Sequence, residues 1–188
     1  VERSRGLGDV YKRQPHPLHI HASNLGVPGN IKSTIETIDA LEGIRGHLTH
    51  VQFHCYGSEG PKKFSSASQQ LAEKLKSSKN ISIDVGQIIF GQTVTTSGDT
   101  MKQHSNRNNA NPKKWVMGDI ECTAGCGVVP FKYKENSFVN ALQWVIGLEI
   151  FLLVDDPWQV VLTTDHPNGG PFTSVSYTHL TLPTNREV

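Results

Sequence analysis

Two kinds of segment alternate along this chain, and the alternation restricts the fold more than any other feature. Four short runs have the composition or the alternation of β-strands, namely residues 17–26, 48–57, 81–85 and 160–164. Longer runs with apolar residues at helical spacing cover residues 31–41, 67–75 and 138–153. Strands separated by helices pair in parallel through right-handed crossovers. The sequence therefore predicts an α/β protein with a parallel sheet.

The segment from Gly91 to Pro130 breaks this pattern. Its middle, from Ser105 to Pro112, is too polar to pack as a core element. We therefore expect residues 91–130 to form a long surface insertion.

Asp165 follows the last predicted strand, at the start of a loop that is rich in Pro and Gly. A carboxylate at this point lies at the C-terminal end of a strand, the rim where catalytic residues collect in α/β barrels. Asp165 is therefore the first candidate catalytic residue. Because Asp beside Pro and Gly also caps turns, a structural role is the alternative.

Histidines occupy the ends of the first two predicted strands. His19 and His21 are two residues apart, so in a strand they face the same side. His50 and His54 share a face of the second strand, with His54 nearer to the rim. Neutral imidazole is a good ligand for zinc and similar divalent ions, so we expect a metal site here. The alternative is that these histidines are hydrogen-bonded core residues.

The composition gives no reason to expect nucleic acid or a membrane as a partner. Lys and Arg number 18 and Asp and Glu 17, so the formal net charge is only +1. The most apolar segment, residues 138–154, carries Asn140, Gln143 and Glu149, which favours a buried helix over a membrane span. The chain has only 3 cysteines, which fits a reducing cytoplasm better than a disulfide framework. Cys122 and Cys126 have no second pair with which to form a structural metal site.

Both ends of the chain look foreign to the rest. Residues 1–14 and 175–188 resemble the translated adapter sequence that flanks truncated reading frames in assembled sequence data. We therefore expect the native part to be residues 15–174, and to be a fragment of a longer protein.

Three short strings at the predicted strand ends carry a family resemblance. Residues 21–24 (His-Ala-Ser-Asn), 53–55 (Phe-His-Cys) and 164–167 (Thr-Asp-His-Pro) resemble the metal-binding ends of the fifth, sixth and eighth strands of amidohydrolases, which have a distorted (β/α)8 barrel. The longer strings 18–26, 50–57 and 163–172 resemble the family of A-type subunits of formylmethanofuran dehydrogenase and their bacterial relatives in the formyltransferase/hydrolase complex. On this resemblance the chain is the C-terminal half of such a barrel.

The resemblance implies a binuclear divalent metal site, usually zinc, that interconverts N-formylmethanofuran with formate and methanofuran, the substrate carrier. It implies that Asp165 binds metal and transfers protons, and that His21 and His54 are metal ligands, with His19 as the alternative to His21. Asn24, His166 and Asn168 are then candidates for substrate binding. The implied partners are the other subunits of the complex, and the implied setting is cytoplasmic one-carbon metabolism such as methanogenesis or formaldehyde oxidation.

The superfamily's His-x-His pair of the first strand and its bridging lysine of the fourth strand are absent from residues 15–174 under this strand assignment. His19 and His21 could instead be that first-strand pair, but a whole barrel needs about 250 residues, more than this chain offers. We therefore expect half of the metal site to be missing. Two other functions remain as alternatives, namely a dihydroorotase- or hydantoinase-type amidohydrolase and a scaffold subunit without catalytic activity.

Overall fold

A computed structural model describes residues 16–97, 127–166 and 168–171 of the chain. Its main sheet has four strands in the order β1-β2-β5-β8. These strands are β1 (Leu18–Ile20), β2 (Gly46–Leu48), β5 (Ile81–Gly86) and β8 (Val160–Thr163). Each strand is parallel to its neighbours. The predicted α/β class with a parallel sheet is confirmed.

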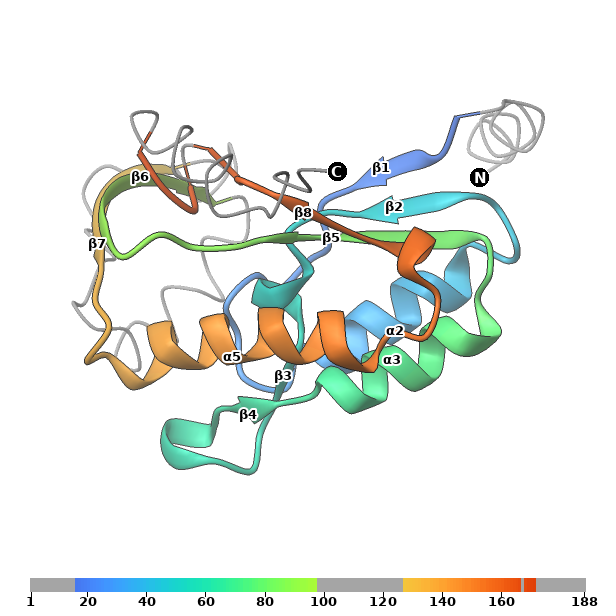
Figure 1. The fold of residues 1–188 in the computed structure, drawn as a ribbon, viewed down its shortest axis with the longest axis horizontal. Helices are drawn as coiled ribbons and strands as arrows, with labels where there is room; N and C mark the ends of the chain where they lie inside the picture. Colours follow the sequence, from blue (N-terminus) through green and yellow to red (C-terminus); the bar gives the residue numbers. More distant parts are fainter. Residues whose placement is uncertain (1–15, 98–126, 167, 172–188) are drawn as a thin grey trace, which may run out of the picture.

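The helices all lie against one side of this sheet (Figure 1). They are α2 (Ile31–Ala40), α3 (Ser68–Ser77) and α5 (Phe138–Leu153), close to the predicted runs. Helix α3 contacts both α2 and α5, and α5 contacts β5. The described part therefore has a helical layer on one face of the sheet, while the sheet's other face carries polar side chains.

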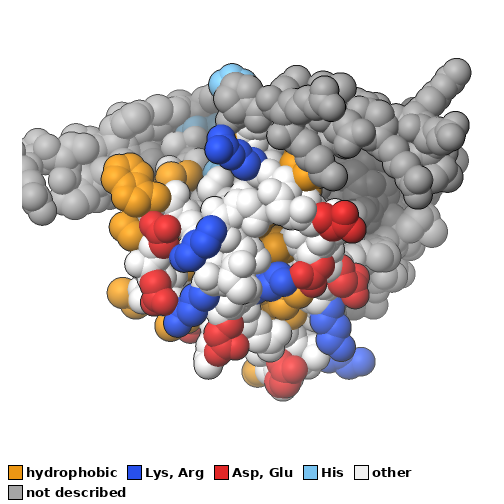
Figure 2. Space-filling model, turned by 90° about the vertical axis from the view of Figure 1, so that its right-hand side faces the viewer, with side chains coloured by type: hydrophobic (Ala, Val, Ile, Leu, Met, Phe, Trp, Pro, Cys, Tyr) orange, Lys and Arg blue, Asp and Glu red, His pale blue; other side chains and the backbone are white. Residues whose placement is uncertain are grey.

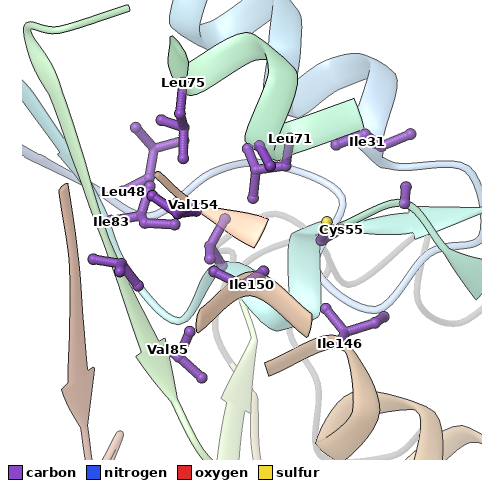
Figure 3. Packing of buried hydrophobic residues seen from close by; sticks show 14 of the residues in the cluster. Ile31, Leu48, Cys55, Leu71, Leu75, Ile83, Val85, Ile146, Ile150 and Val154 are labelled. Carbon is purple, nitrogen blue, oxygen red and sulfur yellow. The ribbon is translucent and has the colours of Figure 1, made fainter. Parts of the chain in front are cut away.

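The core lies between the sheet and the helices, as Figure 3 shows. Alternate residues of the strands, such as Leu48, Ile83 and Val85, point into it and are at most 1% exposed. Leu71 and Leu75 of α3 and Ile146 and Ile150 of α5 face them and are completely buried. Removing this apolar surface from water is the main source of stability, at about 25 cal/mol per Å².

The first two predicted strands are shorter than expected. Strand β1 has 3 residues, and β2 ends at Leu48 instead of continuing to residue 57. Residues Val51–His54 form a 3-10 helix, η1, because the backbone at His50 turns into the left-handed region with φ 38° and ψ 48°. Beyond it, β3 (Tyr56–Gly57) pairs antiparallel with β4 (Ser65–Ser66). The extended strand predicted over residues 48–57 is therefore wrong.

The segment predicted to be a surface insertion begins and ends in regular structure. Strands β6 (Gly91–Ser97) and β7 (Gly127–Tyr133) pair with each other in antiparallel register. Two further 3-10 helices are η2 (Pro61–Lys63) and η5 (Pro157–Gln159). The polar segment 105–112, both cysteines at 122 and 126, and the terminal segments 1–14 and 175–188 lie outside the described residues.

Charged side chains of both signs are interspersed over the described surface in Figure 2, with no large area of one sign on that face. Some large apolar side chains are exposed near the end of α5 and in η5, among them Leu152 at 85% and Trp158 at 89%. Within the described part of the chain, every helix is too short or too polar to cross a bilayer.

Candidate metal centre

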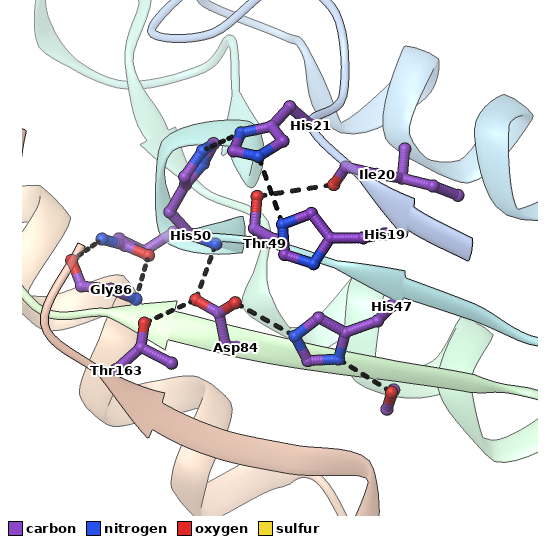
Figure 4. Close-up of polar contacts among 11 residues, drawn as sticks. His19, Ile20, His21, His47, Thr49, His50, Asp84, Gly86 and Thr163 are labelled. Atoms are coloured by element: carbon purple, nitrogen blue, oxygen red, sulfur yellow. Dashed lines mark hydrogen bonds and ion pairs between the residues drawn. The ribbon is translucent and has the colours of Figure 1, made fainter. Parts of the chain in front are cut away.

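Histidine and aspartate side chains gather where the four parallel strands end. His21 directly follows β1, His50 lies two residues beyond β2, and Asp165 lies two residues beyond β8. Strand β5 runs between β2 and β8 and ends at Gly86. Because parallel strands end at the same edge of a sheet, these residues form one site. Figure 4 shows His21 and His50 at this edge.

His21 links two other histidines. Its Nδ1 atom is 2.9 Å from Nε2 of His50, and its Nε2 atom is 3.2 Å from Nε2 of His19. The rings of His19 and His21 meet edge to face, so these two side chains share one side of the strand as predicted. Two nitrogens on one tetrahedral zinc lie about 3.3 Å apart when each bond is about 2.0–2.1 Å. Either histidine pair therefore has nearly the spacing of two zinc ligands.

His21 and His50 are uncharged at neutral pH, because the pKa of each is lowered. Burial lowers the pKa of His50 to about 4, and the neighbouring His21 lowers it further than nearby Asp84 raises it. The pKa of His21 is lowered by burial and by His19. Only the neutral imidazole can donate a lone pair to a metal, so these residues are in the protonation state that metal binding requires.

His54 packs against His50 and is completely buried. Its ring stacks on that of His50 with 5.3 Å between centroids. Neither ring nitrogen has a hydrogen-bond partner among the described residues. Burial lowers its pKa to about 3, although the nearby Ser23 backbone favours the protonated form. Of the two histidines on this segment, His50 is the one within hydrogen-bonding distance of His21.

Asp165 packs against the end of β5. Its backbone is left-handed, with φ 45°, and its carbonyl accepts a 2.6 Å hydrogen bond from the N–H of Gly169. A Cβ atom built on Gly86 would lie 2.5 Å from Cβ of Asp165 and 3.1 Å from Cβ of His50. Asp165 and His50 therefore both approach the space that the missing side chain of Gly86 leaves open.

Asp84 was not recognised from the sequence, yet its carboxylate joins several parts of the site. One oxygen, Oδ1, accepts hydrogen bonds from the His50 backbone N–H at 2.8 Å and from the Thr163 hydroxyl at 2.7 Å. The other, Oδ2, is 3.1 Å from Nε2 of His47. Burial alone would raise the pKa of Asp84, but the hydrogen bonds from His47, Thr163 and His50 outweigh it and lower the pKa. The sequence carried one signal for Asp84. Side chains of β5 alternate between the two faces of the sheet, so the alternation predicts that Asp84 points away from the core.

Asn30 was also missed, because it lies just before the predicted helical run of residues 31–41 and carries no motif of its own. It is 3% exposed, and its side-chain amide donates to the carbonyls of Asn24 at 3.0 Å and Phe53 at 2.7 Å. Its Oδ1 atom accepts from the Tyr56 N–H at 2.9 Å. Asn30 therefore holds the loop after β1 against the segment after β2, and so holds His21 near His50.

The three predicted substrate-binding residues lie in loops at the same edge. The Asn24 amide donates to the Ser33 hydroxyl at 3.0 Å. His166 Nδ1 lies 2.7 Å from the Gly170 carbonyl oxygen, and the Asn168 carbonyl accepts from Thr93 at 3.4 Å. These contacts fix the loops that carry the three residues.

The donor set is suited to a divalent metal, although within the described ranges no three His, Cys, Asp or Glu side chains converge in a ready-made site. What the site offers is a pair of neutral imidazoles at nearly ligand spacing and an adjacent carboxylate. In addition, Nδ1 of His50 has no hydrogen-bond partner in the described part of the chain.

Histidines and an aspartate follow the ends of parallel strands, at the edge of the sheet where catalytic residues collect in α/β barrels. A model of the amidohydrolase family matches residues 4–187, and the chain belongs to that family.

Among its relatives, the chain is 48% identical over 166 residues to FhcA, a subunit of the formyltransferase/hydrolase complex of Methylorubrum extorquens. It is 41% identical over 182 residues to protein FwdA of Methanocaldococcus jannaschii. These matches cover 85% and 90% of this chain but only 30% and 32% of the relatives, so the chain spans about a third of their length. The crystal structure of the Methylorubrum extorquens complex FhcABCD with methylofuran matches with a TM-score of 0.71 and 47% identity, over 87% of this chain and 30% of that one. The resemblance to FhcA and FwdA proteins, the A-type subunits, is confirmed.

Proposed function

We propose that the chain is part of a metal-dependent amidohydrolase subunit that interconverts N-formylmethanofuran with formate and methanofuran. The observation that supports this most is that His21, His50 and Asp165 follow the carboxyl ends of neighbouring parallel strands, in a chain of the amidohydrolase family. In α/β barrels, catalytic residues come from the ends of several different strands at this edge.

As part of the same proposal, the chain forms the C-terminal half of a (β/α)8 barrel. The order of strands in the sheet repeats their order along the chain, and α2, α3 and α5 lie on one face only. A doubly wound sheet would reverse its strand order and carry helices on both faces. A barrel requires the arrangement seen here, with helices outside and the other face turned inward.

We assign His21, His50 and Asp165 as the metal ligands. His50 is preferred to His54, the histidine expected from the sequence, because its Nε2 atom is 2.9 Å from His21, whereas His54 stacks on His50 and makes no hydrogen bond to His21. His19 remains the alternative to His21, since its Nε2 atom is 3.2 Å away. Two neutral imidazoles and a carboxylate suit zinc, and a second metal of a binuclear site would need further ligands from the longer protein.

A divalent metal held here would lower the pKa of a coordinated water towards about 7 and would polarise the formyl carbonyl. In hydrolysis, Asp165 accepts a proton from the attacking water as the new C–O bond forms. It then gives this proton to the amide nitrogen as the C–N bond breaks, which releases formate and the free amine. In the opposite direction the same steps run backwards.

The substrate and partners are proposed from the relatives. One relative belongs to a complex, FhcABCD, that was solved with methylofuran, a carrier of the proposed kind. We therefore propose other subunits of such a complex as partners, and Asn24, His166 and Asn168 as residues that contact the carrier. Their loops lie at the same edge of the sheet as the proposed ligands.

The test uses a full-length parent protein and its Asp165→Asn variant. Asn is nearly isosteric and can still offer an oxygen to a metal, but it cannot accept a proton at neutral pH. We expect the variant to keep its fold and at least part of its metal, and to release formate from formylmethanofuran about 10²–10⁴-fold more slowly. Asp39→Asn is the control, because exposed Asp39 pairs with Lys74 on the helical side, away from the site.

Each alternative predicts a different result in this experiment. A parent that binds metal but hydrolyses only cyclic amides would support the dihydroorotase or hydantoinase type. A parent without metal and without formate release would be a scaffold subunit. Turnover of Asp165→Asn within a few-fold of the parent would leave Asp165 as a turn residue.

A further inference from the structure

We propose that Asp84 is a positioning residue whose carboxylate ties the ends of β2 and β8 to β5 and so sets His50 opposite Asp165. The catalytic consequence of this tie depends on the function proposed above. The tie itself depends only on the contacts of Asp84 with His50, Thr163 and His47, shown in Figure 4.

The geometry places one carboxylate between two strand ends. Asp84 lies on β5, which pairs with β2 on one side and β8 on the other. It is 4% exposed, and its Oδ1 atom accepts from the His50 backbone N–H at 2.8 Å and from the Thr163 hydroxyl at 2.7 Å. Because one oxygen holds both groups, any shift of Asp84 changes both strand ends together.

His50 depends on this contact for its conformation. Its backbone is left-handed, with φ 38° and ψ 48°, a region that is unfavourable for a residue with a Cβ atom. The backbone N–H donates to a side-chain oxygen of Asp84, which gives this buried group an acceptor. Without Asp84 a buried N–H would lose its acceptor, and the left-handed turn would lose the contact that offsets its strain.

Thr163 carries the other half of the tie. It is the last residue of β8, its backbone is in register with Gly86, and Asp165 follows two residues later. Its hydroxyl contact with Asp84 fixes this end of β8 against β5. A displacement of about 1 Å at a reacting group can lower the rate about 10²-fold, so a tie between these strand ends has a catalytic effect without touching substrate.

The test separates a tie from a requirement for negative charge. In Asp84→Asn the amide oxygen can still accept from His50 and Thr163, while the amide N–H can donate to His47 in its other tautomer. Asp84→Ala removes every acceptor, and Thr163→Val removes only the contact to β8. Ser82→Ala is the matched control, because Ser82 lies on the same face of β5 and bonds His47 at 2.8 Å but reaches neither strand end.

All variants are made in the full-length parent and assayed for kcat, KM and metal content. We expect kcat of Asp84→Ala to fall about 10²-fold with little change in KM. Thr163→Val should show a smaller loss of kcat, and Asp84→Asn and Ser82→Ala should stay near the parent. Equal impairment of Asp84→Asn and Asp84→Ala would overturn the proposal, since the negative charge of Asp84 rather than its hydrogen bonds to the strand ends would then be required. A Thr163→Val enzyme with the same kcat as the parent would also overturn it.

Crystal structures of the parent and of the Asp84→Asn, Asp84→Ala and Thr163→Val variants give a readout that does not depend on activity. We expect His50 to keep its left-handed backbone in Asp84→Asn, and the end of β8 to move in Thr163→Val. If Asp84→Ala folds, His50 should leave that conformation, and an unmoved His50 would overturn the proposal. If the parent releases no formate, the proposed function fails, whereas these structures still decide whether Asp84 sets the two strand ends.

Discussion

Gly86 and Asp165 are in contact across the end of the sheet, so closely that a Cβ atom on Gly86 would lie 2.5 Å from Cβ of Asp165. The same atom would lie 3.1 Å from Cβ of His50. Gly86 does not have a positive φ, unlike Gly26 or Gly29. The glycine is therefore required for space between two proposed metal ligands and not for an unusual backbone.

Gly86→Ala should separate His50 from Asp165, because real Cβ atoms do not approach this closely and neither neighbour is the end of a flexible chain. We expect the full-length variant to fold but to lose most of its metal, as measured by metal analysis of the purified protein. Gly46→Ala is the control, since the nearest atoms to its Cβ would be terminal methyl groups of Leu41, Ile81 and Ile20, at the far end of the sheet. That variant should lose some thermal stability and keep its metal. Full metal content in Gly86→Ala would show that the two side chains can move apart without harm.

The choice between His50 and His54 can be tested with single substitutions. We expect His50→Ala to lose metal and His54→Leu to retain it, because His50 is the one within 2.9 Å of His21. Leu fills much of the completely buried space that His54 occupies, so the fold should survive. Metal analysis and circular dichroism on both variants give the answer. The reverse pattern would restore the ligand expected from the sequence.

The sequence favoured His54 over His50 as a ligand, because the contact that separates the two histidines is not local. The run from His50 to Gly57 alternates as a strand does, which makes His54 appear nearest the rim. The strand instead stops at Leu48, and a left-handed His50 begins a 3-10 helix. At this point the His50 N–H donates to Asp84, which is 34 positions away. No pattern within the run itself carries that information.

The metal-free, full-length protein should lose stability as the pH falls below about 6.5. The folded-state pKa of His50 is about 4 and that of His54 about 3, both below the ordinary value of 6.5. Between these values the unfolded chain binds more protons, so the stabilisation present above pH 6.5 is lost towards pH 4 and below. Urea unfolding at several pH values measures this dependence, and His54→Leu should make it shallower. An unchanged slope in that variant would mean that His54 also stays neutral in the unfolded chain or is protonated in the folded one.

Asn30→Asp should destabilise the protein although it changes only one atom of the side chain. The amide donates to the carbonyls of Asn24 and Phe53, and a carboxylate would face both oxygens without a proton to offer. We expect a loss of about 2–3 kcal/mol in the free energy of unfolding, measured by denaturant titration. Asn136→Asp is the control, because Asn136 is exposed before α5. Equal stability of the two variants would contradict the bridging role of Asn30.

Much of the fold could be predicted because its signals are local. The apolar spacing of Ile31, Ile35 and Ile38 is enough to predict α2, and the run from Ile81 to Val85 is enough to predict β5. The pairing of β6 with β7 was missed, since the two strands are far apart in sequence and neither shows a clear alternation of apolar and polar residues. The roles of Asp84, Gly86 and Asn30 depend on contacts between segments, and for that reason the sequence alone could not reveal them.

The order of the strands also determines the order in which the site can be assembled during synthesis. In the main sheet β1 pairs with β2, β2 with β5 and β5 with β8, so the order of the strands in the sheet is the same as their order along the chain. A growing chain can therefore add strands one by one to an existing edge, without waiting for distant segments before it begins to fold. The histidine pair His21 and His50 can take its final arrangement once β5, which carries Asp84, has docked, whereas the carboxylate of Asp165 arrives only with the last of these strands. On the ribosome, the nitrogen donors can thus be in place before the oxygen donor has been made.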